Sequence, residues 1–331
     1  MKNKSIYLIY ETVNCTPNGD PDNEGEQRYN EATKRAVVSD LRIKRYGRDK
    51  LESVGEQVFY FYDRESIEQD GKKLSGAAAR FVAFCKDKGY EIDKKFSSEK
   101  AMDILLKEFS DVRIFGAALT SKDYKASITG ALQFDAENES INEVIHGKNI
   151  INRGITSIFP SDIKKGQGSM GRDSFLKYGL FCIKGRFSAQ VAKLNKASDK
   201  DVALMLTAIW DGISSANSRS KQGQSPIAFI VVEHPTELTK EGCLGRTLRK
   251  DFIPFNLVPK SSLNEIYCKN DYELDFSPLK VEIEKTVKNV VDNVTIYCDD
   301  EEFVQKHFSC LPENCKIVDP FDALINLVSS D

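Results

Sequence analysis

The 331-residue chain lacks several patterns that mark large classes of enzymes. It has only three histidines, His146, His234 and His307, and none has a cysteine or aspartate at catalytic spacing. A catalytic triad or a metal hydrolase is therefore not supported. No glycine-rich phosphate-binding motif and no internal repeat occurs, so neither a nucleotide-binding fingerprint nor a solenoid is indicated.

Long apolar runs and paired cysteines are also missing. The longest apolar run, Ile227–Val232, has the length of a strand and is far short of the ~18 residues of a membrane span. The eight cysteines include no CxxC motif. The closest pair, Cys310 and Cys315 with His307 nearby, has no second ligand pair, so no metal or cofactor is expected. Scattered cysteines without a secretory signal indicate a cytoplasmic protein.

What the chain does have is an uneven charge distribution. Its formal net charge is −3, but residues 261–331 carry 15 acidic against 6 basic side chains, which is a net of −9. Residues 1–260 carry 35 acidic against 41 basic side chains, which is a net of +6. A polyanionic partner is therefore expected to bind the first 260 residues.

Hydrophobic periodicity predicts an α+β fold. Strands are predicted over 5–13, 57–64, 127–135, 177–187 and 225–232, and helices over 37–51, 75–88 and 98–110, with a further helix from Ser198. Ser98 is a plausible N-cap, and Ser198 with Asp201 forms a capping-box pattern. Apart from a long insertion, this order is the ferredoxin-like βαββαβ pattern. Whether 57–64, 111–119 or 127–135 supplies the second core strand stays open.

The helix predicted over 37–51 carries four cations, Arg42, Lys44, Arg45 and Arg48. Several of them share an arc with apolar residues near the start of the helix, whereas a surface helix usually separates charge from apolar residues. One interpretation is a helix that packs on a sheet and meets phosphates at its end. The other is a solvated helix end with snorkelling side chains.

Two further basic segments have the composition of a single-strand binder. Residues 150–174 contain the cations Arg153, Lys164, Lys165 and Arg172, three glycines near the tip, and the apolar Phe159 and Met170. Cations neutralise a nucleic-acid backbone, and apolar side chains insert beside bases. Arg219, in the Ser218–Lys221 segment, is a second candidate for phosphate contact. Both segments also fit ordinary surface loops.

Asp20 and Asp22 lie in a loop rich in glycine, proline and asparagine. A metal-dependent nuclease needs further acidic side chains that converge on these two, and none can be identified in the sequence. The simpler interpretation is a turn in which the aspartates bond to the local backbone.

Six stretches of this sequence, in this order, resemble the CRISPR-associated Cascade backbone subunit, the seventh Cas family in its type I Csd/Csh form, within the RAMP superfamily. They are GDPDNEG (19–25), VVSDLRIKRYGRD (37–49), DVRIFGAAL (111–119), TGALQF (129–134), SMGRDSFLKYGLF (169–181) and SRS (218–220). The resemblance covers about residues 5–235. One departure is that Gln27–Asn30 lacks the Pro-Arg that the family usually has after GDPD.

The resemblance implies a ferredoxin-like, RRM-like palm with a helical finger insertion and a β-hairpin thumb. On this basis the palm spans 5–64 and 175–240, the finger 65–149, the thumb 150–174, and an acidic extension 241–331. The implied RNA-binding residues are Arg42, Lys44, Arg45, Arg48, Arg153, Lys164, Lys165, Met170, Arg172 and Arg219.

The implied function is a non-enzymatic, guide-RNA (crRNA) binding subunit of a CRISPR antiviral ribonucleoprotein. Several copies would form a helical assembly along the guide, with other Cascade subunits and target DNA as partners and no membrane contact. The alternative is a metal-dependent ribonuclease of the related type III kind using Asp20 or Asp22. Incubation with labelled RNA and Mg²⁺ separates the two.

Overall fold

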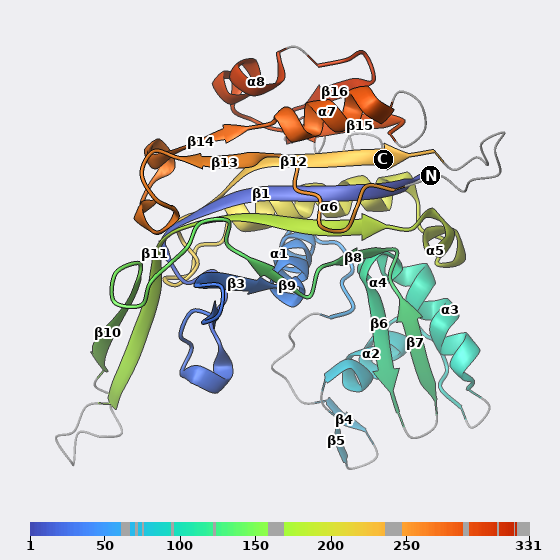
Figure 1. The fold of residues 1–331 in the computed structure, drawn as a ribbon. Coiled ribbons are helices and arrows are strands. Elements are labelled where there is room, and N and C mark those ends of the chain that lie inside the picture. Colours follow the sequence, from blue (N-terminus) through green and yellow to red (C-terminus); the bar gives the residue numbers. More distant parts are fainter. Residues whose placement is uncertain are drawn as a thin grey trace.

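A seven-stranded sheet forms the centre of the computed structural model (Figure 1). The strands run in the order β10-β11-β1-β12-β15-β16, and β8 pairs with β11. Their bounds are β1 Asn3–Cys15, β8 Leu132–Phe134, β10 Ile150–Ser157, β11 Ser169–Phe187, β12 Gln224–His234, β15 Asn293–Tyr297 and β16 Cys315–Val318. The structure describes residues 1–60, 67–69, 72–74, 76–93, 96–121, 124–157, 169–235, 247–286, 291–309, 311–320 and 322.

Strand β1 lies between β11 and β12, and both of its faces are buried. Successive side chains of a strand point to opposite faces. Ile6 and Leu8 therefore pack against the helices α1 (Asp40–Ser53) and α6 (Asp199–Ser214), whereas Tyr7 and Ile9 face the C-terminal segment. This double burial explains why the strand predicted over 5–13 reads as a nearly continuous apolar run.

The predicted start of the basic helix is wrong. Val37 and Val38 belong to β3 (Arg35–Ser39), which pairs with β9 (Glu137–Glu139), and helix α1 begins only at Asp40. The side chain of Ser39 caps α1 by accepting a hydrogen bond from the Arg42 amide. The β-branched valines thus lie in a strand, and the cap residue separates them from the helix.

Helices α1 and α6 cross at very close range. A Cβ added to Gly212 would lie 2.2 Å from the carbonyl oxygen of Tyr46, so no larger residue fits at this crossing without a backbone shift. The predicted capping box of Ser198 and Asp201 at the start of α6 is confirmed. The crossing brings α1 beside the connector that leaves the end of α6.

The segment between α1 and β8 has a hydrophobic core of its own, built around Phe81, Leu105 and Phe109. It contains β4 (Ile67–Gln69), β5 (Lys72–Leu74), α2 (Gly76–Asp87), α3 (Ser98–Glu108), α4 (Ser110–Phe115), β6 (Gly116–Thr120) and β7 (Lys125–Thr129). The predicted helices over 75–88 and 98–110 are confirmed within a few residues, but the N-cap of α3 is Ser97, not Ser98.

The two strands predicted within this segment need correction. Residues 57–60 of the first form no strand, and residues 61–64 lie outside the described part of the chain. The second, over 127–135, is split into β7 and β8 at Gly130, where an added Cβ would lie 2.1 Å from the carbonyl carbon of Phe115. Strand β8 pairs with β11 in the main sheet, whereas β7 pairs with β6.

The C-terminal segment covers the face of the sheet opposite α1 and α6 (Figure 1). Buried side chains from it, including Phe255, Ile266 and Leu279, pack on Ile9 and Ile230. Besides β15 and β16, it contains β13 (Asn256–Pro259), η3 (Leu263–Glu265), η4 (Lys269–Asp271), β14 (Tyr272–Asp275), α7 (Ser277–Thr286) and α8 (Glu301–Phe308). The weak periodicity after residue 240 did not predict these elements.

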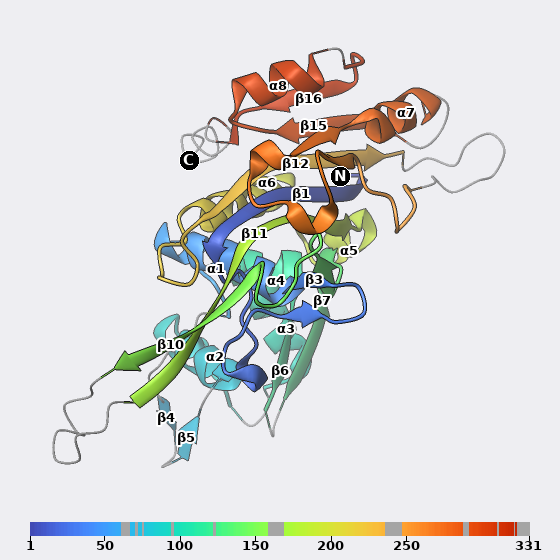
Figure 2. The same cartoon turned by 60° about the vertical axis from the view of Figure 1, so that its left-hand side comes forward.

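The hairpin of β10 and β11 projects from the sheet, as Figure 2 shows. The first part of β11 pairs with β10, with Arg153 opposite Asp173, and the second part pairs with β1. This 19-residue strand is longer than the strand predicted over 177–187. The short elements η1 (Pro21–Asn23), β2 (Tyr29–Asn30) and α5 (Ala189–Leu194) complete the fold.

Candidate nucleic-acid interface

The connector between α6 and β12, residues 215–223, joins two neighbouring cavities. One cavity, of about 410 Å³, is lined by Arg219 and Ser220 of the connector, by Thr16, and by Arg153 of the hairpin. It thus brings together two of the cations that the sequence singled out, from segments 66 residues apart.

Arg219 and Arg153 are both exposed. The side chain of Arg219 is 73% exposed, and its guanidinium contacts Asp173 Oδ2 at 2.7 Å. The guanidinium carbon of Arg153 lies 5.0 Å from the centre of the Phe175 ring. A surface ion pair contributes only ~0–1 kcal/mol, so a phosphate can replace Asp173 at little cost.

The second cavity, of about 370 Å³, lies between the ends of α1 and α6. Arg42 and Tyr46 of α1 line it together with Ser218 and Lys221 of the connector. The Arg42 guanidinium carbon lies 3.9 Å from the centre of the Tyr46 ring, a cation–π geometry, and its buried Nε has no hydrogen-bond partner. Arg42 is therefore held in place while one of its donors remains unused.

Lys221 lines the second cavity and was not among the predicted binding residues. Its ammonium donates hydrogen bonds to the backbone oxygens of Thr16 and Pro17. Burial, reinforced by the nearby charge of Arg42, lowers the pKa of Lys221 to about 8. The SRSK sequence shows a cation here, but the burial of its ammonium depends on Thr16 and Pro17, which are 205 and 204 residues away in sequence.

Two cations of α1 are engaged inside the protein. Lys44 is buried and donates to Asp40 Oδ2 at 2.8 Å and to Gln133 Oε1 at 3.1 Å. Arg48 donates from Nε to Asp111 Oδ2 at 3.0 Å. Both link α1 to its surroundings and present little charge to solvent.

Arg45 is more exposed and contacts Asp49 on the next turn of the helix at 2.5 Å. The predicted residues Lys164 and Lys165, and Phe159 beside them, lie outside the described residues. The backbone of Met170 and Arg172 lies in β11, but their side chains are outside what the structure describes.

Asp20 and Asp22 form a capped turn. The carboxylate of Asp20 accepts a hydrogen bond from the Asp22 amide at 3.3 Å and contacts Arg28 at 3.4 Å. Pro21 follows the cap and starts η1. Among the described residues, no group of three or more histidine, cysteine or acidic side chains is arranged to hold a metal ion. The geometry of this loop is that of a structural turn.

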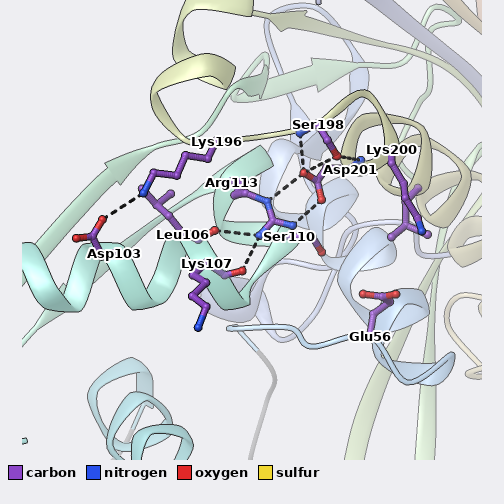
Figure 3. A pocket seen from close by; sticks show the side chains of 11 residues that line it. Glu56, Asp103, Leu106, Lys107, Ser110, Arg113, Lys196, Ser198, Lys200 and Asp201 are labelled. Atoms are coloured by element: carbon purple, nitrogen blue, oxygen red, sulfur yellow. Dashed lines mark hydrogen bonds and ion pairs between the residues drawn. The ribbon is translucent and has the colours of Figure 1, made fainter. Parts of the chain in front are cut away.

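A larger cavity, of about 700 Å³, lies between α3, α4 and the start of α6 (Figure 3). Its centre is Arg113, which contacts both carboxylate oxygens of Asp201, at 2.6 and 3.0 Å. None of the predicted RNA-binding residues lines it. The central ion pair of this cavity ties the insertion to the start of α6, so we regard the cavity as a structural feature.

In the described part of the chain, no helix is both long and apolar enough to span a membrane.

Comparisons with known proteins show the family and support the fold. A model of the family described as "CRISPR-associated protein Cas7" matches residues 2–277. A curated protein of Haloferax volcanii named "CRISPR-associated protein Cas7" is 26% identical over 254 residues, with 71% of each chain covered. A chain of the solved assembly named "CRISPR RNA-guided surveillance complex, pre-nicking" is similar over 99% of this chain and 100% of that one. Its TM-score is 0.51 and its identity 11%, so it supports the fold alone.

Proposed function

The chain belongs to the CRISPR-associated protein Cas7 family, and from this membership we propose that it binds guide RNA as the backbone subunit of a type I CRISPR interference complex. In this role it holds the phosphates of the guide and leaves the bases free to pair with target DNA. Base pairing then supplies the sequence specificity, and the protein contacts the backbone.

The observation that carries this proposal is the joining of Arg42, Arg153 and Arg219 around one connector. The three cations come from a helix, a hairpin and a loop, and they line adjoining cavities. A row of cations along a groove is what a single-stranded backbone requires. Base stacking on the open sheet face, as in isolated RNA-recognition domains, is not available because the C-terminal segment buries that face.

We propose that the sheet with α1 and α6 is an RRM-like palm. The order β12-β1-β11-β8 supports this, since it is the strand order of the ferredoxin-like pattern once later strands are set aside. The palm then comprises 5–64 and 175–240 together with β8, the rest of the insertion at 65–149 is the finger, and the projecting hairpin at 150–174 is the thumb. Residues 241–331 form the acidic extension.

Further copies of the chain, other Cascade subunits and target DNA are the partners that this role requires. Assembly of copies along one guide places the thumb of each copy against RNA held by the next. The role requires no chemistry from the protein, and the bonding of Asp20 inside its own turn agrees with a non-enzymatic subunit.

The test is RNA-dependent assembly, measured by size-exclusion chromatography with light scattering. The wild type is expected to form large oligomers with single-stranded RNA. The triple variant Arg42→Met, Arg153→Met, Arg219→Met is expected to remain a folded monomer. Arg249→Met is the matched control, because this arginine is exposed and paired with Asp251 in the C-terminal segment. Assembly of the triple variant at wild-type level would refute the proposed interface.

We further propose that Met170 near the hairpin tip displaces a nucleotide at regular intervals along the guide. Met is unbranched and adaptable, which suits a side chain that fills the gap beside an unstacked base. Chemical probing of the bound guide is expected to show regularly spaced reactive positions that fade in Met170→Gly. Uniform protection in the wild type would exclude base displacement.

A further inference from the structure

The ammonium of Lys221 bonds within the protein, in contrast to the exposed guanidinium of Arg219 two residues earlier. Its side chain is half-buried, and it donates to the carbonyl oxygens of Thr16 and Pro17. Those carbonyls belong to the loop that follows β1, whereas Lys221 ends the turn that follows α6. The lysine thus links two loops across the edge of the proposed RNA groove.

The turn held by Lys221 is the one that presents Arg219. The amides of Lys221 and Gln222 both donate to the Ser218 carbonyl at 2.9 Å, so Arg219 and Ser220 form the apex of a tight turn. The Thr16 amide donates to the Ser220 carbonyl at 2.8 Å and thereby docks the apex on the same loop. The position of Arg219 therefore depends on how firmly the turn is held against residues 16–17.

A hydrogen-bond chain continues from this turn to the basic helix. The side chain of Gln224 donates to the Lys221 carbonyl at 2.9 Å and accepts from the Tyr46 hydroxyl at 2.8 Å. Tyr46 in turn lies under the guanidinium of Arg42. The turn, the lysine and the tyrosine thus form a scaffold that connects Arg219 to Arg42.

We infer that Lys221 is a positioning residue for RNA binding, which fastens the Ser218–Lys221 turn to Thr16 and Pro17 and so fixes Arg219 for phosphate contact. This inference rests on the proposed function. The titratable and charged groups near the ammonium are the Arg42 guanidinium and the Cys15 thiol, and Asp49 and Lys50 line the same cavity. The pKa of Lys221, lowered to about 8, and the pKa of Cys15, raised to about 12, are far enough apart to be titrated separately.

The first experiment is a double-mutant cycle between Lys221→Met and Arg219→Met, with affinity for an oligoadenylate RNA as the readout. Each single variant is expected to bind at least about tenfold more weakly, the factor that corresponds to one charge-assisted hydrogen bond. In the Lys221→Met background, Arg219→Met is expected to have little further effect. If the loss of affinity in the double variant equals the product of the losses in the two single variants, the positioning role is wrong, because independent contacts do not couple.

The pH profile supplies a second readout. Affinity of the wild type is expected to fall above about pH 8, where Lys221 loses its proton, because the neutral amine holds the two carbonyls less well. Lys221→Arg is expected to bind RNA well, and its affinity is expected not to fall up to about pH 9.5, because arginine does not titrate in that range. Adenine does not titrate there either. A wild type and an arginine variant with the same profile would refute the inference.

A third measurement does not need RNA. Hydrogen exchange of the free protein is expected to be faster in Lys221→Met for peptides that cover Val13–Thr16 and Ser218–Gly223, with unchanged protection elsewhere. Lys316→Met, in the exposed strand β16, is the control for the same change of charge. Unchanged exchange would overturn the inference whether or not RNA binds. Failure of the wild type to bind RNA would overturn the proposed function and with it the RNA-binding role of Lys221, and faster exchange in Lys221→Met would then show only that the lysine fastens the turn.

Discussion

Arg48 and Asp111 form an ion pair that is almost completely buried, with 12% and 0% of their side chains exposed. The second oxygen of Asp111 accepts a hydrogen bond from the Phe59 amide at 3.0 Å, and the Arg48 guanidinium carbon lies 4.8 Å from the centre of the Tyr60 ring. The pair therefore joins α1 to α4 of the insertion. A cation that the sequence marks as an RNA contact is held here by a carboxylate 63 residues later.

Arg48→Met is expected to lower the free energy of unfolding by about 3–5 kcal/mol, because it leaves Asp111 buried without its charged partner. Chemical denaturation measures the change. Arg45→Met is the matched control on the same helix, since the Arg45–Asp49 pair is 40% and 44% exposed and contributes only ~0–1 kcal/mol. Equal stability of the two variants would contradict the structural assignment of Arg48.

Lys44→Glu is expected to unfold the protein, because it places a second carboxylate beside Asp40 in a buried position. Circular dichroism and size-exclusion chromatography report whether the fold is retained. Arg219→Glu, whose side chain is 73% exposed, should keep the fold and lose RNA binding. A folded Lys44→Glu variant that fails to bind RNA would instead place Lys44 in the interface.

The salt dependence of RNA affinity is expected to report individual phosphate contacts. For single strands the logarithmic slope changes by about 0.7 for each phosphate that the protein no longer neutralises. Arg153→Met and Arg219→Met should each reduce the slope by this amount, while Arg249→Met in the C-terminal segment leaves it unchanged. A slope that is insensitive to both variants would show that neither residue neutralises a phosphate.

Asp201 should make stability depend on pH. Its burial raises the carboxyl pKa, but hydrogen bonds from Arg113 and Ser198 outweigh this, and the folded-state pKa lies below the usual value for an aspartate. Because the folded pKa is depressed, the stabilisation is present above the unfolded pKa and is lost as pH falls through the folded value. The difference in melting temperature between wild type and Asp201→Asn should therefore be greatest near neutral pH and shrink below about pH 4. A constant difference down to about pH 3 would contradict this linkage.

The C-terminal segment is expected to be an integral layer of the fold. Leu279 of α7 is 1% exposed in the core shared with the sheet, whereas Val281 on the same helix is 40% exposed. Leu279→Ala should destabilise by about 2–5 kcal/mol, and Val281→Ala by well under half of that. Urea denaturation compares the two. Equal, small effects would mean that the segment contributes little to the stability of the sheet.

The sequence by itself determined the local features whose causes lie within a few residues. The apolar, β-prone run of Ser5–Val13, the capping box of Ser198 and Asp201, and the turn chemistry of Asp20 all follow from neighbours in the chain, and the structure contains each. The ordered motifs were also sufficient for the family resemblance, because motif order and spacing are properties of sequence. The fold class followed from the same strand and helix order.

Only the tertiary structure decided which cations face solvent. Arg42, Lys44 and Arg48 lie on one helix, yet Asp111 neutralises Arg48, Asp40 and Gln133 hold Lys44, and Arg42 stacks on Tyr46 and lines a cavity. The pairing of β3 with β9, which moves the start of the helix from residue 37 to Asp40, depends on residues about 100 positions away. Periodicity reports which face of an element is apolar, but the partner that covers a charge comes from another part of the chain and is set by packing.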